Sequence, residues 1–89
     1  MKIEYDPGKD AINRVKHLVS LADAALIEWQ WALCIKDARS DYGESRTIAY
    51  APIGSRVYCV VFTRRGEALR VISLRKANRR EVRLYADKI

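Results

Sequence analysis

The hydrophobic period changes abruptly within residues 69–85, and this change constrains the fold more than any other feature of the sequence. Up to residue 75, apolar and polar residues alternate, which predicts a strand. One face of that strand is expected to carry Val71, Ser73 and Arg75, and the other face Arg70, Ile72 and Leu74. After Ala77 the apolar residues recur at helical spacing, and Asn78 with Glu81 three residues later is typical of a helix start. A strand is therefore expected to run directly into a terminal helix.

Basic residues cover this junction. Residues 64–89 contain nine Lys/Arg against three Asp/Glu, whereas residues 1–63 contain eight of each, so the net charge of +6 lies entirely in the later segment. A run of charges is often only a solvated face. Here the arginines alternate with apolar residues on a strand, which holds them in place and favours a phosphate-binding site. A pI near 9.6 also favours an anionic partner: nucleic acid, an anionic membrane surface or an acidic protein.

Length and composition predict a single globular domain over residues 1–89, with a modest core. No apolar run approaches the roughly 18 residues that a membrane span needs. The N-terminus lacks the apolar region of a signal peptide, so no membrane association and a cytoplasmic location are expected. Cys34 and Cys59 lie in strand-like apolar runs and are interpreted as reduced core thiols. Two cysteines and one histidine do not make a metal site.

Two helices are expected in the first third of the chain. Asp6 and Pro7 suit the N-cap and first position of a helix. The inward stripe of this helix is expected to comprise Ala11, Ile12, Val15 and Leu18. Ser20, with Asp23 three residues later, forms a capping box for a second, short helix over residues 21–28.

The middle of the chain predicts strands. Residues 2–5 are a possible edge strand, residues 29–36 alternate like a half-buried strand, and residues 37–45 read as an exposed loop. Further strands are expected over residues 46–51, 57–63 and 69–75. The strand over residues 57–63 is apolar on both faces and should be central, and Gly66 is the expected positive-φ residue of the hairpin that follows it. The expected fold is α+β: two N-terminal helices, an antiparallel sheet of about four strands with the helices against one face, and a C-terminal helix.

No nucleotide-binding loop, zinc-protease helix or serine-hydrolase elbow is present. Cleavage of RNA, however, needs only a group that accepts the proton of the 2′-hydroxyl, one that protonates the leaving oxygen, and charge that stabilises the phosphorane. Arginine suits the last role because it is always charged and binds bidentately. His17 is either a cap or surface residue at the end of a helix, or a functional group that faces the bound phosphate together with Lys9 and Lys16. The residues alone leave a nucleic-acid binder and an enzyme equally open.

The order and spacing of many residues resemble the BrnT family of toxins from type II toxin–antitoxin pairs. The resemblance covers nearly the whole chain and is carried by DPxKxxxNxxKHxVS from Asp6 to Ser20, Arg46, Gly54, Val61-Phe62-Thr63, Arg65-Gly66, and Arg70 to Ala77 with Glu81 and Tyr85. The chain departs from the family pattern at Leu18, where glycine is usual, at Leu21, where an aromatic residue is common, and at Tyr5, where tryptophan is common.

The resemblance implies a RelE-like fold, an endoribonuclease that works without a metal or other cofactor, and inhibition of translation. It also implies neutralisation by a ribbon–helix–helix antitoxin in a complex of two toxin and two antitoxin chains, which would bind operator DNA through the antitoxin. The catalytic candidates that follow are His17, Arg64, Arg70, Ser73, Arg75 and Glu81. The RNA-binding candidates are Lys9, Lys16, Arg65, Lys76, Arg79, Arg80, Arg83 and Tyr85. A non-catalytic nucleic-acid-binding module and an inactive toxin-like interaction protein remain as alternatives.

Overall fold

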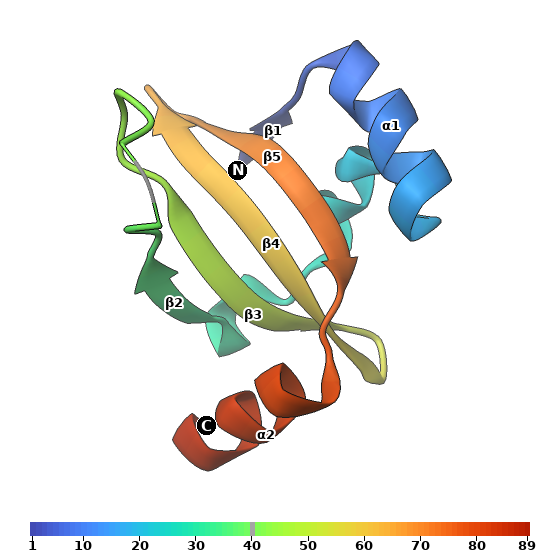
Figure 1. Ribbon diagram of the computed structural model, residues 1–89, viewed down its shortest axis with the longest axis vertical. Helices are drawn as coiled ribbons and strands as arrows, with labels where there is room; N and C mark the ends of the chain where they lie inside the picture. The colour runs from blue at the N-terminus through green and yellow to red at the C-terminus, as the bar shows by residue number, and fades with distance from the viewer. Residues whose placement is uncertain (40) are drawn as a thin grey trace.

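A five-stranded mixed sheet organises the computed structural model, which describes residues 1–39 and 41–89 (Figure 1). The strands are β1 (Lys2–Glu4), β2 (Leu33–Lys36), β3 (Thr47–Ile53), β4 (Arg56–Arg65) and β5 (Ala68–Lys76), in the spatial order β1-β5-β4-β3-β2. Helix α1 (Pro7–His17) lies beside β5, and α2 (Arg79–Lys88) follows it at the end of the chain. Two 3-10 segments, η1 (Leu21–Leu26) and η2 (Trp29–Trp31), connect α1 to β2. No helix among the described residues is long and apolar enough to cross a membrane.

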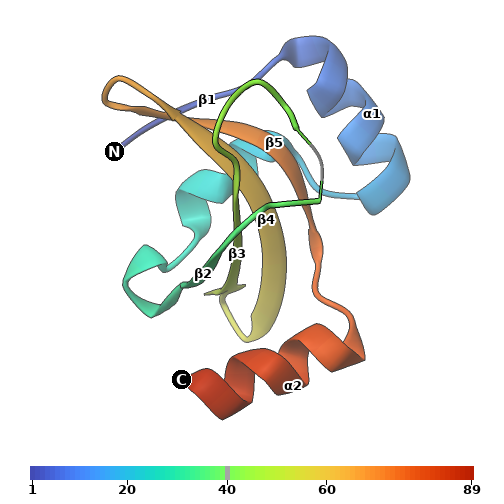
Figure 2. The ribbon, with the colours of Figure 1, turned by 60° about the vertical axis from the view of Figure 1, so that its left-hand side comes forward.

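The predicted sheet of about four antiparallel strands is wrong. Strands β2 to β5 pair antiparallel, but β1 adds a fifth strand that pairs parallel with β5 (Figure 2). The N-terminal strand was expected only as a possible edge. Its neighbour is fixed by contacts with a segment more than 60 residues away, which local pattern does not encode. The central position predicted for residues 57–63 is confirmed, because β4 lies in the middle of the sheet.

The predicted second N-terminal helix is also wrong. Ser20 and Asp23 do form the expected capping box, but the segment that follows is the 3-10 element η1. Ile27, which follows it, adopts an extended backbone and is buried, so the chain leaves the helix after six residues. Short 3-10 runs of this kind are common connectors. The strand predicted from residue 29 begins only at Leu33, because Trp29–Trp31 forms η2.

One face of the sheet is closed by apolar packing. Trp29 packs its ring edge-on against Phe62 there, with ring centroids 5.4 Å apart. The buried cluster joins η1 and the following residue to β3, β4 and β5 through Leu21, Ala24, Ile27, Ala49, Ala51, Val60, Phe62, Leu69, Val71 and Leu74. Each fully buried leucine contributes about 1.5–3 kcal/mol through removal of its apolar surface from water. This closed face supplies the core of the protein.

A β-bulge in β5 changes which side chains share a face. Val61 pairs with Ser73, but the next residue, Phe62, pairs with Val71, so Ile72 is an extra residue. The strict alternation predicted for residues 69–75 is therefore wrong: Val71 and Leu74 both face the core. The bulge thereby places Arg70, Ser73 and Arg75 together on the opposite, open face of the sheet.

Helix α1 is turned the opposite way from its predicted orientation. Its buried residues are Asp10 and Asn13, whereas Ile12, Val15 and Leu18 are 66%, 84% and 83% exposed. Ala11, the remaining member of the predicted inward stripe, is exposed as well. The expectation that the apolar stripe faces the core is therefore wrong.

Hydrogen bonding explains this orientation of α1. Pairing between β1 and β5 ends at Arg70, and further along β5 the Asn13 carboxamide donates to the Leu74 carbonyl (2.8 Å) and accepts from its N–H (3.2 Å). One side chain thus supplies the donor and the acceptor that a neighbouring strand would offer. The Asp10 carboxylate accepts from Leu21 N–H (2.7 Å) and from the Ser20 hydroxyl (3.0 Å), which fixes the start of η1. An unpaired buried backbone group costs about 1–3 kcal/mol, so these bonds outweigh the apolar stripe.

Several local predictions hold. Asp6 caps α1 with Pro7 at its first position, Asn78 and Glu81 form the predicted capping box of α2, and Gly66 has a φ of +60°. Cys59 is buried as expected, but Cys34 is exposed, so its assignment to the core is wrong. Ser40, which falls in the predicted loop 37–45, lies outside the described residues.

Candidate active site

The open face of the sheet is hollowed between β5 and the start of α2. Strands β3, β4 and β5 form its floor, α2 closes one end, and Arg39 reaches it from the segment after β2. The lining residues are Arg39, Ile48, Tyr50, Cys59, Val61, Ser73, Arg75, Asn78, Arg80 and Glu81. The strand-to-helix junction recognised in the sequence therefore forms the wall of a cavity, and three arginines line it.

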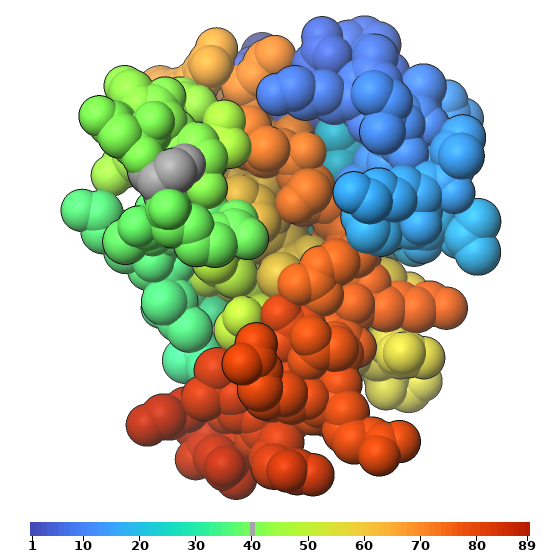
Figure 3. Space-filling view, in the orientation of Figure 1, coloured from blue at the N-terminus to red at the C-terminus, as the bar shows by residue number. Residues whose placement is uncertain are grey.

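A second hollow adjoins the first and is bounded by α1. It is lined by Lys9, Ile12, Asn13, Lys16, His17, Ile72 and Ser73. Ser73 lines both hollows, so the two lie side by side next to the bulge of β5. Figure 3 shows this face, with the atoms of β5 visible between α1, α2 and the segment that follows β2. We call the two hollows together the cationic groove. Its cations come from α1 on one side and from Arg39, Arg75 and Arg80 on the other.

Arg75 and Glu81 form a bidentate ion pair in the groove. Nη1 of Arg75 lies 2.8 Å from Oε1 of Glu81, and Nη2 lies 2.9 Å from Oε2. Glu81 is buried, and its Oε1 also accepts the N–H of Asn78 (2.9 Å). The hydrogen bonds from Arg75 are the main reason that the pKa of Glu81 lies below its usual value, so its carboxylate is charged at neutral pH. The position of the guanidinium is thus fixed through the helix cap.

This pairing leaves one edge of the guanidinium open. Arginine has five N–H donors in a planar fork. Within the part of the chain that the structure describes, Arg75 uses three donors, two to Glu81 and one from Nη1 to the Lys76 carbonyl (3.3 Å). The Nε–H and the second hydrogen of Nη2 remain, and they lie on the same edge. Two parallel donors of this kind match two oxygens of a phosphate.

His17 ends α1 on the other side of the groove. Its pKa is lowered from the usual 6.5, first by burial and then by the positive charges of Lys16 and Arg75. His17 and Arg75 come from distant parts of the chain, and each lines a hollow that Ser73 also lines. A lowered pKa leaves the imidazole neutral at pH 7, which is the form that accepts a proton.

The other arginines that the sequence suggested as site residues lie at different distances from the groove. Arg70 shares the open face but lies 3.6 Å from Glu4, and Arg65 lies 3.6 Å from Glu44. Arg64 pairs with Leu69, whose side chain is in the core, so Arg64 lies on the opposite face of the sheet at the hairpin end. The structure does not bring Arg64 into the groove.

The basic residues of the strand end and α2 also separate. Lys76 is exposed, Arg80 lines the groove, and Arg79 and Arg83 line a different hollow between α2 and the turn from β3 to β4. The hydroxyl of Tyr85 donates to the Trp31 carbonyl (2.8 Å), which ties α2 to η2. Only part of the predicted basic set therefore faces one site.

The groove residues that sequence reasoning missed include Arg39, Tyr50 and Cys59. Tyr50 and Cys59 are paired across β3 and β4 on the open face, and the Tyr50 hydroxyl lies 3.5 Å from Oε2 of Glu81. Burial raises the pKa of the Cys59 thiol, so it stays protonated. The register of the strands would have identified both residues, but that register depends on long-range pairing. Nothing in the charged segment around Arg39 distinguishes it from its neighbours.

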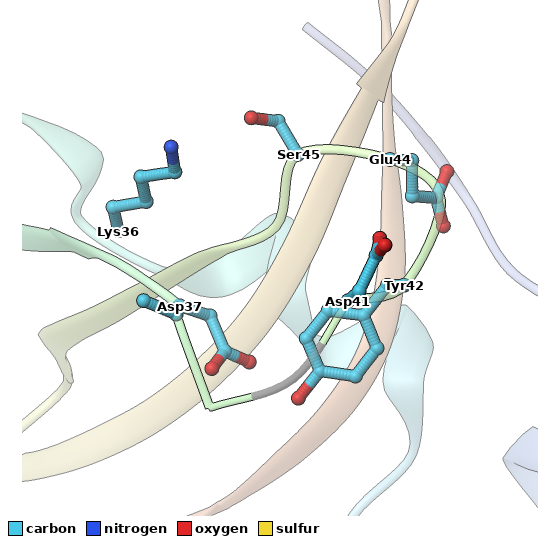
Figure 4. Close-up of a pocket in the computed structure, with 7 residues that line it drawn as sticks. Lys36, Asp37, Asp41, Tyr42, Glu44 and Ser45 are labelled. Carbon is cyan, nitrogen blue, oxygen red and sulfur yellow. The ribbon is translucent and has the colours of Figure 1, made fainter.

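A third hollow differs in charge. It lies in the segment between β2 and β3 and is lined by Lys36, Asp37, Ala38, Asp41, Tyr42, Glu44 and Ser45 (Figure 4). Asp37 is buried there, and the hydrogen bonds from Arg39 lower its pKa to about 2. Three carboxylates make this hollow unsuitable for a phosphate backbone. No group of three or more potential metal-ligating side chains occurs in residues 1–39 and 41–89.

The sheet, its two end helices and the cationic groove define a small basic α+β domain with a site suited to anions. The model of one family matches residues 5–81: the ribonuclease toxin BrnT of type II toxin–antitoxin systems. This match spans most of the chain, so the protein belongs to the BrnT family, and the resemblance found in the sequence is confirmed. Membership implies an RNA substrate and a protein antitoxin as partner. No curated protein matches the chain.

Proposed function

We propose that the protein cleaves RNA in the cationic groove without a metal ion, and that it thereby stops translation in the cytoplasm. The observation that carries this proposal is the open edge of the Arg75 guanidinium, which Glu81 holds in place on the groove that also contains His17. A fixed pair of donors is most effective when charge develops at a set position. Ser73, where the two hollows meet, marks the expected position of the scissile phosphate.

The reaction that fits this arrangement is internal transesterification. The 2′-hydroxyl of the substrate loses its proton to neutral His17 and attacks the adjacent phosphorus. The bond from phosphorus to the 5′-oxygen then breaks, that oxygen takes up a proton from water, and His17 releases its proton to the solvent. The products are a 2′,3′-cyclic phosphate and a 5′-hydroxyl end. Arg75 stabilises the phosphorane through its Nε–H and Nη2–H donors, which supply the charge stabilisation that a metal ion provides in other nucleases.

The remaining candidates take supporting roles. Glu81 positions Arg75, and Lys9, Lys16 and Arg80 bind the RNA backbone along the groove. Arg70, which faces the same side of the sheet but is paired with Glu4, extends this surface. Arg64, Arg79 and Arg83 lie outside the groove and take no part in the reaction.

Substitution of Arg75 tests the site. Arg75→Ala should lower the rate of RNA cleavage about 10²- to 10³-fold, as loss of an oxyanion-type donor does. It also leaves buried Glu81 without its main partner, so we expect a loss of about 1–3 kcal/mol in stability. Cleavage must therefore be measured well below the melting temperature of the variant. Arg79→Ala is the matched control, because Arg79 lies on the far side of α2 and should cleave like the parent.

The non-catalytic reading makes a different prediction. If the Arg75–Glu81 pair is only a structural clamp, a folded Arg75→Ala protein retains whatever RNA activity the parent shows. That result would overturn the assignment, and so would loss of cleavage when EDTA removes divalent metal ions from the parent protein. A parent that binds RNA with no 2′,3′-cyclic phosphate product would favour the binding module instead.

We further propose that the antitoxin is a ribbon–helix–helix protein and that the complex contains two chains of each kind. Ribbon–helix–helix proteins dimerise to bind DNA, so each dimer offers two equivalent positions for toxin and would direct the complex to its own operator. The mass of the co-expressed complex should correspond to equal numbers of the two chains. An unequal ratio would contradict this assembly.

A further inference from the structure

We propose that the exposed apolar side of α1 is the surface on which the antitoxin docks, through a segment that places apolar side chains on Ile12, Val15 and Leu18 and acidic side chains on the neighbouring cations. This inference rests on family membership, which supplies a protein antitoxin. It does not depend on how the groove cleaves RNA. We call the three apolar residues the α1 ridge.

The α1 ridge is large and fixed in its orientation. Its side chains are 66%, 84% and 83% exposed, the greatest exposure of any large apolar residues of the described chain apart from Met1. The opposite side of α1 is held by Asp10 and Asn13 through hydrogen bonds to η1 and β5. Rotation of the helix to bury the ridge would break all of these bonds. The ridge therefore stays in water until a partner covers it.

Leu18 strengthens the case. It adopts a φ of +63° and a ψ of +23°, a left-handed conformation that costs a residue with a branched side chain about 1–2 kcal/mol and is suited to glycine. Its side chain gains nothing in return within the fold, because it is almost fully exposed. A leucine at this position is explained by a contact with another molecule.

The charges around the α1 ridge specify the partner. Lys9 and Lys16 are exposed on the same helix, and Arg14 remains largely exposed beside its bond to buried Asp10. An amphipathic segment with acidic flanks is complementary to this surface, whereas a second copy of this basic chain would bring like charges together. RNA would satisfy the cations but would leave the apolar side chains in water.

The position of the α1 ridge also explains neutralisation. Ile12 lines the cationic groove together with Lys16 and His17. A segment seated on the ridge would cover the α1 side of the groove and would pair with the lysines that the RNA backbone needs. Docking on α1 therefore blocks substrate binding without contact with Arg75.

Affinity measurements test the proposal. The antitoxin encoded beside the toxin gene would be titrated into toxin variants by isothermal calorimetry. Val15→Asp should weaken binding about 10- to 100-fold, as loss of an interface anchor does, while melting temperature and RNA cleavage stay at the parental level because Val15 is exposed and outside the groove. Leu18→Gly is a second variant and should also bind the antitoxin more weakly. Because this substitution relieves backbone strain, its weaker binding cannot be attributed to unfolding.

Val82→Asp is the matched control. Val82 is an exposed apolar residue that lines the hollow between α2 and the β3–β4 turn, where Arg56, Arg79 and Arg83 also offer positive charge. This variant should bind the antitoxin within about threefold of the parent. Parental affinity of Val15→Asp, or a larger loss for Val82→Asp, would overturn the proposal. The proposal would also be overturned if the toxin forms a dimer in the absence of antitoxin and Val15→Asp dissociates this dimer. The ridge would then be covered by a second copy of the toxin.

Discussion

The two faces of the sheet differ in what holds them together. The closed face packs η1 against β3, β4 and β5 mainly through apolar side chains. The open face carries paired charges and polar groups, with Glu81 bonded to both Arg75 and Tyr50. Apolar packing positions whole helices and strands, but only as closely as the shapes of their side chains fit together. A bidentate ion pair, in contrast, fixes the position and orientation of a single functional group. The closed face therefore gives stability, and the open face gives a site with defined geometry.

The largest expected effect tests the open face. Because burial and the charges of Lys16 and Arg75 hold the pKa of His17 below 6.5, the imidazole is neutral at pH 7 and kcat/KM should fall only as the pH drops below 6.5. His17→Gln should lower kcat/KM about 10²- to 10⁴-fold, as loss of a general base does, and should abolish this acid limb. The melting temperature should change little, because His17 is only half-buried. An acid limb that persists in His17→Gln would assign the titration to another group.

The next effect tests the closed face. Leu74 is fully buried, and Leu74→Ala should lower the free energy of unfolding by about 2–5 kcal/mol through lost burial and the cavity left behind. The backbone of Leu74 keeps its bonds to Asn13, so the folded fraction should cleave RNA at close to the parental rate. Urea unfolding measures the first quantity, and cleavage normalised to the folded fraction measures the second. A much larger loss of activity than of folded protein would show that the two faces are not separable.

Local signals in the sequence predicted more than the pairing of distant segments. Both capping boxes, the start of α1, the central strand β4 and the hairpin at Gly66 were predicted correctly, because each depends on residues a few positions apart. The orientation of α1 was not, because Asn13 bonds to a residue 61 positions away. The bulge at Ile72 and the parallel pairing of β1 depend on the same kind of distant contact.

The candidate site divides in the same way. The basic character of residues 64–89 drew attention to the strand-to-helix junction, and in the structure Arg75, Ser73 and Arg80 line the same groove as Lys16 and His17 of α1. Charge alone did not distinguish these groove residues from Arg64, Arg79 and Arg83. The direction of Arg64 depends on the alternation of side chains along β4, and that of Arg79 and Arg83 depends on which side of α2 meets the sheet. Tyr50 and Cys59 were missed because strands read singly do not show which uncharged residues lie opposite an arginine.

Asn13 connects the two faces, and its loss should affect both by an intermediate amount. Asn13→Ala removes the bonds to Leu74 and Val19, which leaves backbone groups at the edge of β5 unpaired and should cost about 1–3 kcal/mol in stability. Because α1 also carries Lys16 and His17, cleavage by the folded fraction should fall as well. Asn13→Asp is the comparison variant, since it keeps the acceptor for the Leu74 N–H but loses the donor. Full activity in a destabilised Asn13→Ala protein would show that α1 is placed by other contacts.

The smallest effect concerns the end of α1, where the chain accepts strain that neither face requires. Leu18→Gly removes the side chain from a left-handed residue and should raise the free energy of unfolding by up to about 1 kcal/mol, since the strain relieved slightly exceeds the extra entropy that glycine gives the unfolded chain. Leu18→Ala separates the two contributions, because it removes most of the side chain but keeps the strain, and it should leave stability nearly unchanged. Thermal melting of both variants beside the parent measures the difference. If glycine destabilises the protein as much as alanine or more, the side chain of Leu18 supports the helix end after all, and its exposure in the free toxin no longer indicates a partner.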